Sequence, residues 1–130
     1  MPKKFIQSWL NFCEKYLKAK GYKFKQEISI VFLNQKEAKA LNLQYRNKAY
    51  ATDILSFEME NVLGELVICP QVLKAQANEH QFKFREELGY MLIHGVLHLL
   101  GFDHESNRGE AEKMFKLQDQ LFDLALQKLK

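Results

Sequence analysis

The sequence predicts an α+β fold, a single compact domain in which a small mixed β-sheet packs with about five helices. The chain has 130 residues, of which 47% are hydrophobic, and this suits one domain with a substantial core. Apolar residues recur at helical spacing over most of the chain, whereas only three short runs look like strands. With two prolines and six glycines, nothing in the chain marks a linker, so residues 1–130 are expected to form one domain.

The first element is expected to be a helix over about Pro2–Ala19, because its aromatic and apolar residues fall on one helical face. Gly21 is placed to end it. The next run, Ile28–Leu33, is short, apolar and β-branched, and is therefore predicted to be a strand.

Asn34 is followed three residues later by Glu37, a spacing typical of a capping box, and it predicts a helix that reaches Tyr45 or Arg46. Two further strand-like runs are Ile54–Met59 and Glu65–Cys69. The short segment between them predicts a hairpin.

Three helices are expected in the rest of the chain. Pro70 suits the first position of a helix running to about Glu79. The residues from Lys83 to Leu100 have strongly helical spacing, with Gly101 as the stop, and this helix is predicted to be central to the fold. The last helix is expected to begin near Asn107, with Glu110 as its capping partner.

Composition limits the classes of partner. A net charge of +3 and a pI near 8.8 permit an anionic partner without indicating one. The N-terminus lacks the apolar run of a signal peptide, and no stretch approaches a membrane span. Cys13 and Cys69 lie far apart in apolar surroundings, as buried thiols do in a reducing compartment. A cytoplasmic protein without a membrane partner is therefore expected.

Three of the four histidines fall within eleven residues, as His94, His98 and His104. Residues four apart share a helical face, so His94 and His98 can bind one ion, and Gly101 lets the chain turn back so that His104 supplies a third nitrogen. A single histidine on an apolar face is usually an ordinary core residue, but three imidazoles buried without partners would be costly. We therefore predict one metal ion, Zn²⁺, although nickel, copper and iron also accept such ligands.

Three histidines leave the fourth coordination position of zinc to water, as in catalytic zinc sites. Asp103 is either an acid that orients a ligand or assists proton transfer, or an ordinary turn residue. The histidine spacing matches that of metzincin proteases, which carry a glutamate as general base directly after the first histidine. Here that position is Gly95, either for close packing or for room above the metal, and this argues against proteolysis.

Cleavage of a phosphodiester makes a different demand, because zinc activates water without a strong base and a cation must stabilise the phosphate. The chain has three arginines, Arg46, Arg85 and Arg108. Arg46 closes a predicted helix, where an arginine often only interacts with terminal carbonyls. Arg85 and Arg108 are expected to be surface charges.

The segment from His94 to His104 resembles the motif of the YbeY family of bacterial ribosomal-RNA endoribonucleases. Two further blocks are similar to family elements. The first runs from Leu41 through Tyr45-Arg46 to the Thr52-Asp53-Ile54-Leu55-Ser56-Phe57 strand, and the second is Leu63–Ile68. Met114, Phe115 and Gln118 also fit. The chain departs from the family at Glu65, where aspartate is usual, and at Ala49-Tyr50-Ala51.

The resemblance implies a metal-dependent hydrolase domain over residues 1–130. Its expected activity is that of a zinc-dependent, single-strand-specific endoribonuclease acting in 16S rRNA 3′ end maturation and ribosome quality control. It implies metal binding by His94, His98 and His104, and substrate phosphate binding and catalysis by Arg46. Asp103, which follows from the residues and not from the resemblance, is the further candidate for assisting catalysis. The expected partners are ribosomal RNA, ribosomal subunits and ribosome-assembly proteins, not DNA. Two alternatives stay open: a metzincin-like metallohydrolase or peptidase, and a non-catalytic zinc-containing ribosome-assembly factor.

Overall fold

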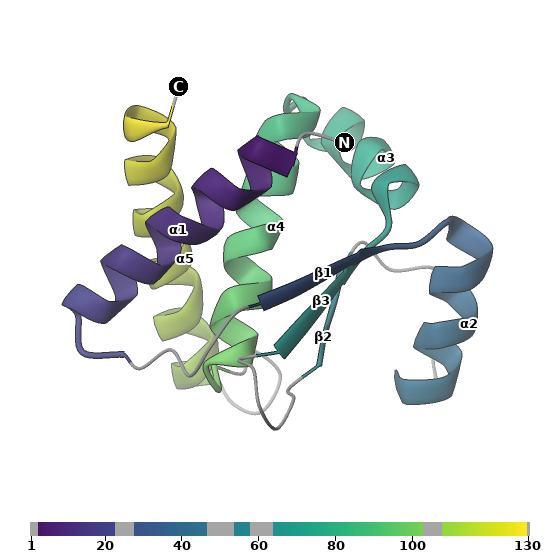
Figure 1. Cartoon of the computed structure of the whole chain (residues 1–130), viewed down its shortest axis with the longest axis horizontal. Helices are drawn as coiled ribbons and strands as arrows, with labels where there is room; N and C mark the ends of the chain where they lie inside the picture. The colour runs from purple at the N-terminus through teal and green to yellow at the C-terminus, as the bar shows by residue number, and fades with distance from the viewer. Residues whose placement is uncertain (1–2, 23–27, 47–53, 58–63, 103–107, 130) are drawn as a thin grey trace.

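The computed structural model describes residues 3–22, 28–46, 54–57, 64–102 and 108–129. Its elements follow the predicted order of helix, strand, helix, two strands and three helices, and their bounds differ from expectation by about a residue where both ends are described (Figure 1). The elements are α1 (Lys3–Ala19), β1 (Ile28–Phe32), α2 (Gln35–Arg46), β2 (Ile54–Phe57), β3 (Gly64–Ile68), α3 (Pro70–His80), α4 (Phe84–Leu99) and α5 (Arg108–Lys128).

The three strands form one mixed sheet in the order β1-β3-β2. β1 runs parallel to β3, with Ile28 opposite Gly64, and β2 runs antiparallel to β3, with Ile54 opposite Ile68. The predicted pairing of the second and third strands is thereby confirmed. Because β3 is the central strand, it is buried almost throughout, and this explains why its sequence is a nearly continuous apolar run.

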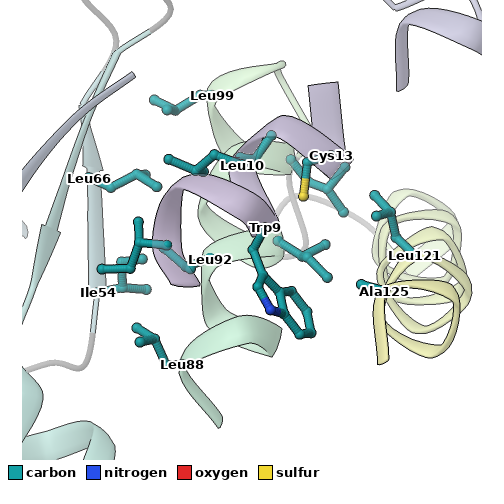
Figure 2. Packing of buried hydrophobic residues seen from close by; sticks show 14 of the residues in the cluster. Trp9, Leu10, Cys13, Ile54, Leu66, Leu88, Leu92, Leu99, Leu121 and Ala125 are labelled. Carbon is teal, nitrogen blue, oxygen red and sulfur yellow. The ribbon is translucent and has the colours of Figure 1, made fainter. Parts of the chain in front are cut away.

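Helix α4 is the centre of the fold. It contacts α1, α3 and α5 as well as β2 and β3, so it lies between the sheet and the two long terminal helices (Figure 1). Buried side chains from α4 and from all of these neighbouring elements form one cluster, and Figure 2 shows part of it, including Trp9 of α1, Leu92 of α4 and Leu121 of α5. Cys13 and Cys69 are both buried free thiols, as expected.

Two glycines let neighbouring elements approach α4 closely. A Cβ atom at Gly89 would lie 2.7 Å from the Trp9 ring, and a Cβ atom at Gly95 would lie 2.8 Å from Cδ2 of Leu66. A side chain at either position would force the Trp9 ring or the Leu66 side chain out of its present place. The two glycines therefore allow α1 and the sheet to pack closely against α4.

The predicted start of α2 and the predicted end of α1 are both present, the first as a capping box and the second as a left-handed glycine. The N–H of Glu37 donates to the Asn34 side chain at 2.8 Å, and the N–H of Asn34 donates to the Glu37 carboxylate at 3.1 Å, which completes the capping box. Gly21 ends α1 with φ +96°, a left-handed conformation that favours glycine. Asn107 lies outside the described residues. None of the described helices is long and apolar enough to cross a membrane.

Candidate metal centre

His94 and His98 project together from consecutive turns of α4, as their spacing predicts. Their Nε2 atoms are 3.1 Å apart, and the two rings meet edge to face with their centroids 4.6 Å apart. Two nitrogens that each bind one zinc ion at roughly 2.0–2.1 Å with a tetrahedral angle lie about 3.3 Å apart. The pair therefore fits the donor spacing that a tetrahedral ion requires.

The buried amide of Gln118 on α5 fixes the orientation of His94. Its Nε2 donates to the backbone carbonyl of Tyr90 at 3.3 Å, so its Oε1 faces the Nδ1 of His94 at 3.0 Å. Because an amide oxygen only accepts, Nδ1 of His94 must carry the hydrogen. In the neutral ring the lone pair is then on Nε2, the atom that faces His98. This is the tautomer in which His94 can bind a metal through Nε2.

Asp119, the next residue of α5, also forms a hydrogen bond to Tyr90 of α4. The hydroxyl of Tyr90 donates to the Asp119 carboxylate at 2.8 Å. Burial, then the hydrogen bond and charge of Asp119 and finally the charge of Glu87, raise the pKa of the Tyr90 hydroxyl. Tyr90 thus stays protonated and continues to donate at every physiological pH. Two adjacent residues of α5, Gln118 and Asp119, therefore fix the register between α5 and the histidine helix.

The chain reverses direction directly after the histidine pair. Gly101 has φ +100°, and the N–H of Phe102 donates to the Leu97 carbonyl at 3.0 Å, so the helix ends in the left-handed turn that the sequence predicts. His104 and Asp103 follow this turn but lie outside the described residues. Within the described part of the chain, no three His, Cys, Asp or Glu side chains are grouped to hold a metal. The three-histidine site therefore stays a prediction, of which the structure describes two members.

The three arginines belong to three different helices, α2, α4 and α5. Arg46 is the last residue of α2, as predicted, but its side chain lies outside the described part of the structure. Arg85 lies over the ring of Phe5, with its guanidinium carbon 5.1 Å from the ring centroid. Arg108 is almost fully exposed and pairs with Glu112 on the same helix at 3.3 Å.

Gly95, the position at which metzincins carry their general base, faces the sheet. A Cβ atom there would lie 2.8 Å from Leu66 and 3.1 Å from Ile54, both in the core. The first of the two explanations, close packing, therefore accounts for this glycine. A glutamate at this position would direct its carboxylate into apolar side chains, so the helix offers no place for that base.

Sequence reasoning missed two polar contacts of α4. The sequence places Gln118 on one face of the last helix and in a family motif but does not indicate its contact with His94, which it makes as a buried amide within the otherwise apolar inner face of α5. Glu87 is 2% exposed, and its carboxylate meets Nδ1 of His80, the one histidine outside the predicted metal site, at 3.0 Å. In both cases the available signal was a polar residue at a core position of an amphipathic helix.

Comparison with known proteins agrees with the motifs. The sequence model of the family described as Endoribonuclease YbeY matches residues 2–125. A protein of Bdellovibrio bacteriovorus named Endoribonuclease YbeY is 48% identical, over 98% of this chain and 89% of its own length. Its counterpart of the same name from Staphylococcus carnosus is 39% identical, over 75% of this chain and 71% of its own length.

The fold also matches a solved structure. The solution structure of TM1509 from Thermotoga maritima superposes with a TM-score of 0.67 at 29% identity, covering 95% of this chain and 82% of that one. The family model and the Bdellovibrio relative span nearly the whole chain, including α4 and most of α5. The protein whose histidine pair and buried glutamine are described above is therefore a member of the Endoribonuclease YbeY family.

Proposed function

We propose that this protein is a zinc-dependent endoribonuclease that cuts single-stranded ribosomal RNA in the cytoplasm. In this proposal it acts in 16S rRNA 3′ end maturation and in ribosome quality control, with ribosomal subunits and ribosome-assembly proteins as its partners. The supporting observation is the 3.1 Å approach of the two Nε2 atoms of His94 and His98, with the His94 tautomer set by Gln118. Family membership supplies the class of reaction.

The donor set fits one zinc ion. His94 and His98 would hold it together with His104, and such an ion supplies Lewis-acid activation of water for attack on phosphorus. Gln118 keeps Nδ1 of His94 protonated, which prevents that ring from turning its lone pair away from His98. In the proposal Arg46 binds the substrate phosphate, and Asp103 assists proton transfer.

The placement of Gly95 favours this reaction over peptide hydrolysis. The metzincin mechanism needs a carboxylate beside the first histidine, and here that direction is filled by Leu66 and Ile54. Phosphodiester cleavage depends more on stabilising the charge of the transition state than on a strong base. No comparable feature of the described residues favours a peptidase.

The test is cleavage of an end-labelled single-stranded RNA by purified protein, with zinc content measured on the same samples. Wild type should cut and hold one zinc per chain. His98→Ala should lose both properties, while Arg46→Ala should keep its zinc and lose cleavage. Arg108→Ala is the matched control, because Arg108 makes only an exposed ion pair, and this variant should cut normally.

Equal cleavage by all four proteins would show that a contaminating nuclease is responsible. A wild type that holds one zinc but cuts neither free RNA nor RNA in ribosomal subunits would contradict the nuclease proposal. That result would favour a non-catalytic assembly factor, for which chelation should lower the melting temperature without changing any chemistry.

A further inference from the structure

The ring of Phe115 on α5 lies directly beside the histidine pair. Its centroid is 6.0 Å from that of His94, and the two ring planes are inclined by only 28°. Phe115 is nevertheless 39% exposed, whereas the preceding Met114 is fully buried. A solvent-accessible aromatic ring therefore lies next to the ring of a candidate metal ligand.

Core packing does not require an aromatic residue at this position. The inner face of α5 is formed by Met114, Leu117, Gln118, Leu121 and Ala125, all of them buried. Phe115 lies at the border of this face, next to Gln118 in the helical repeat, and it exposes apolar surface that a polar residue would not. Exposed aromatic rings at binding sites commonly contact a flat ligand.

We infer that Phe115 is a stacking platform for one unpaired nucleobase of the RNA substrate beside the scissile phosphate. This inference rests on the proposed function. Every base has an aromatic face, so stacking on a phenyl ring holds single-stranded RNA without selecting a sequence. A base inside a duplex is already stacked on its neighbours and cannot lie against the ring. Phe115 thus contributes to discrimination between single and double strands.

The first test compares Phe115→Leu with Phe115→Tyr, because leucine keeps apolar contact with His94 but removes the aromatic face, and tyrosine keeps both. Phe82→Leu is the matched control, since Phe82 is 49% exposed and its ring lies against His80, not against the candidate ligands. Phe115→Leu should raise KM for a short single-stranded RNA about 5- to 50-fold, with kcat and zinc affinity nearly unchanged. Phe115→Tyr and Phe82→Leu should behave as wild type.

A series of RNAs, each with one abasic nucleotide, then locates the stacked base. At one position the missing base should raise KM for wild type and remove the difference between wild type and Phe115→Leu, because no base is left to stack. An unchanged KM in Phe115→Leu would overturn the inference. A fall in kcat and zinc affinity at constant KM would also overturn it, because Phe115 would then only support the ring of His94.

Binding of a single strand that contains 2-aminopurine separates this inference from the proposed function, because it needs no cleavage. Stacking on Phe115 should quench the 2-aminopurine fluorescence when the RNA binds to wild type, and this quench should be absent with Phe115→Leu. If RNA is not cut but the quench depends on Phe115, the stacking platform stands and the nuclease proposal fails. If RNA is cut and no quench depends on Phe115, the platform fails and the nuclease proposal stands.

Discussion

The side-chain oxygen of Gln118 lies 3.0 Å from Nδ1 of His94, and this contact joins two helices at residues 24 positions apart in the chain. It determines which nitrogen of His94 carries the hydrogen, and therefore which nitrogen can bind a metal. Since Gln118 is fully buried, water does not replace it easily.

Replacing Gln118 with alanine should lower zinc affinity about 10- to 100-fold, because His94 loses the partner that holds its ring and tautomer. Competition with a chromophoric zinc chelator measures the affinity directly. Gln120→Ala is the control, since Gln120 lies exposed on the same helix and should leave the affinity unchanged. Equal affinities for the two variants would contradict an orienting role for Gln118.

Introducing the metzincin glutamate at position 95 should destabilise the protein. Gly95→Glu directs a carboxylate against Leu66 and Ile54, and an uncompensated buried charge lowers the free energy of unfolding by about 3–5 kcal/mol. Urea denaturation provides the measurement. Gly109→Glu makes the same chemical change on the exposed first turn of α5, where the helix dipole favours a negative charge, and should be harmless. A stable Gly95→Glu protein with peptidase activity would contradict our description of this position.

The stability of the protein should fall in alkaline solution, partly through Cys13. Burial raises the pKa of this thiol from its ordinary value of 9.0 to about 12. Above pH 9 the unfolded chain releases the proton while the folded chain keeps it. The stabilising contribution is therefore complete below pH 9 and is lost as the pH rises toward 12. The expected slope is about 1.4 kcal/mol per pH unit.

Comparison of wild type with Cys13→Ala isolates this effect, because every other titrating group is common to both proteins. The free energy of unfolding from urea titrations at pH 8, 9, 10 and 10.5 should converge for the two proteins as the pH rises. Parallel curves would show that the thiol titrates alike in both states.

The contact between His80 and Glu87 should couple α3 to α4 by about 1 kcal/mol, a modest value because the His80 side chain is half exposed. A double-mutant cycle with His80→Ala and Glu87→Gln measures the coupling free energy of unfolding. The same cycle on Arg108 and Glu112, both highly exposed, should give a value near zero. A zero value in both cycles would show that the buried carboxylate of Glu87 gains nothing from its partner.

Features encoded by neighbouring residues could be predicted from the sequence. The capping box of Asn34 and Glu37, and the left-handed stops at Gly21 and Gly101, depend only on the few residues around them. The pairing of His94 and His98 follows from helix geometry alone. The family motifs then added the class of reaction, which no local pattern contains.

Features that depend on distant segments could not be predicted. The two explanations for Gly95 were separated only by the position of the sheet, which a single helix does not specify. Gln118 could be recognised as a polar residue on an apolar face, but its partner on α4 is set by how the two helices pack. For the same reason no pattern in the sequence points from Glu87 to His80.

The two glycines of α4 have a consequence for the histidines between and beyond them. With Trp9 against Gly89 and Leu66 against Gly95, the backbone of α4 is in near-direct contact with α1 and with the sheet. The helix therefore cannot turn about its axis without displacing both neighbours. His94 and His98 are thus preorganised, and the entropy of aligning their backbone is lost when the protein folds and not when an ion binds.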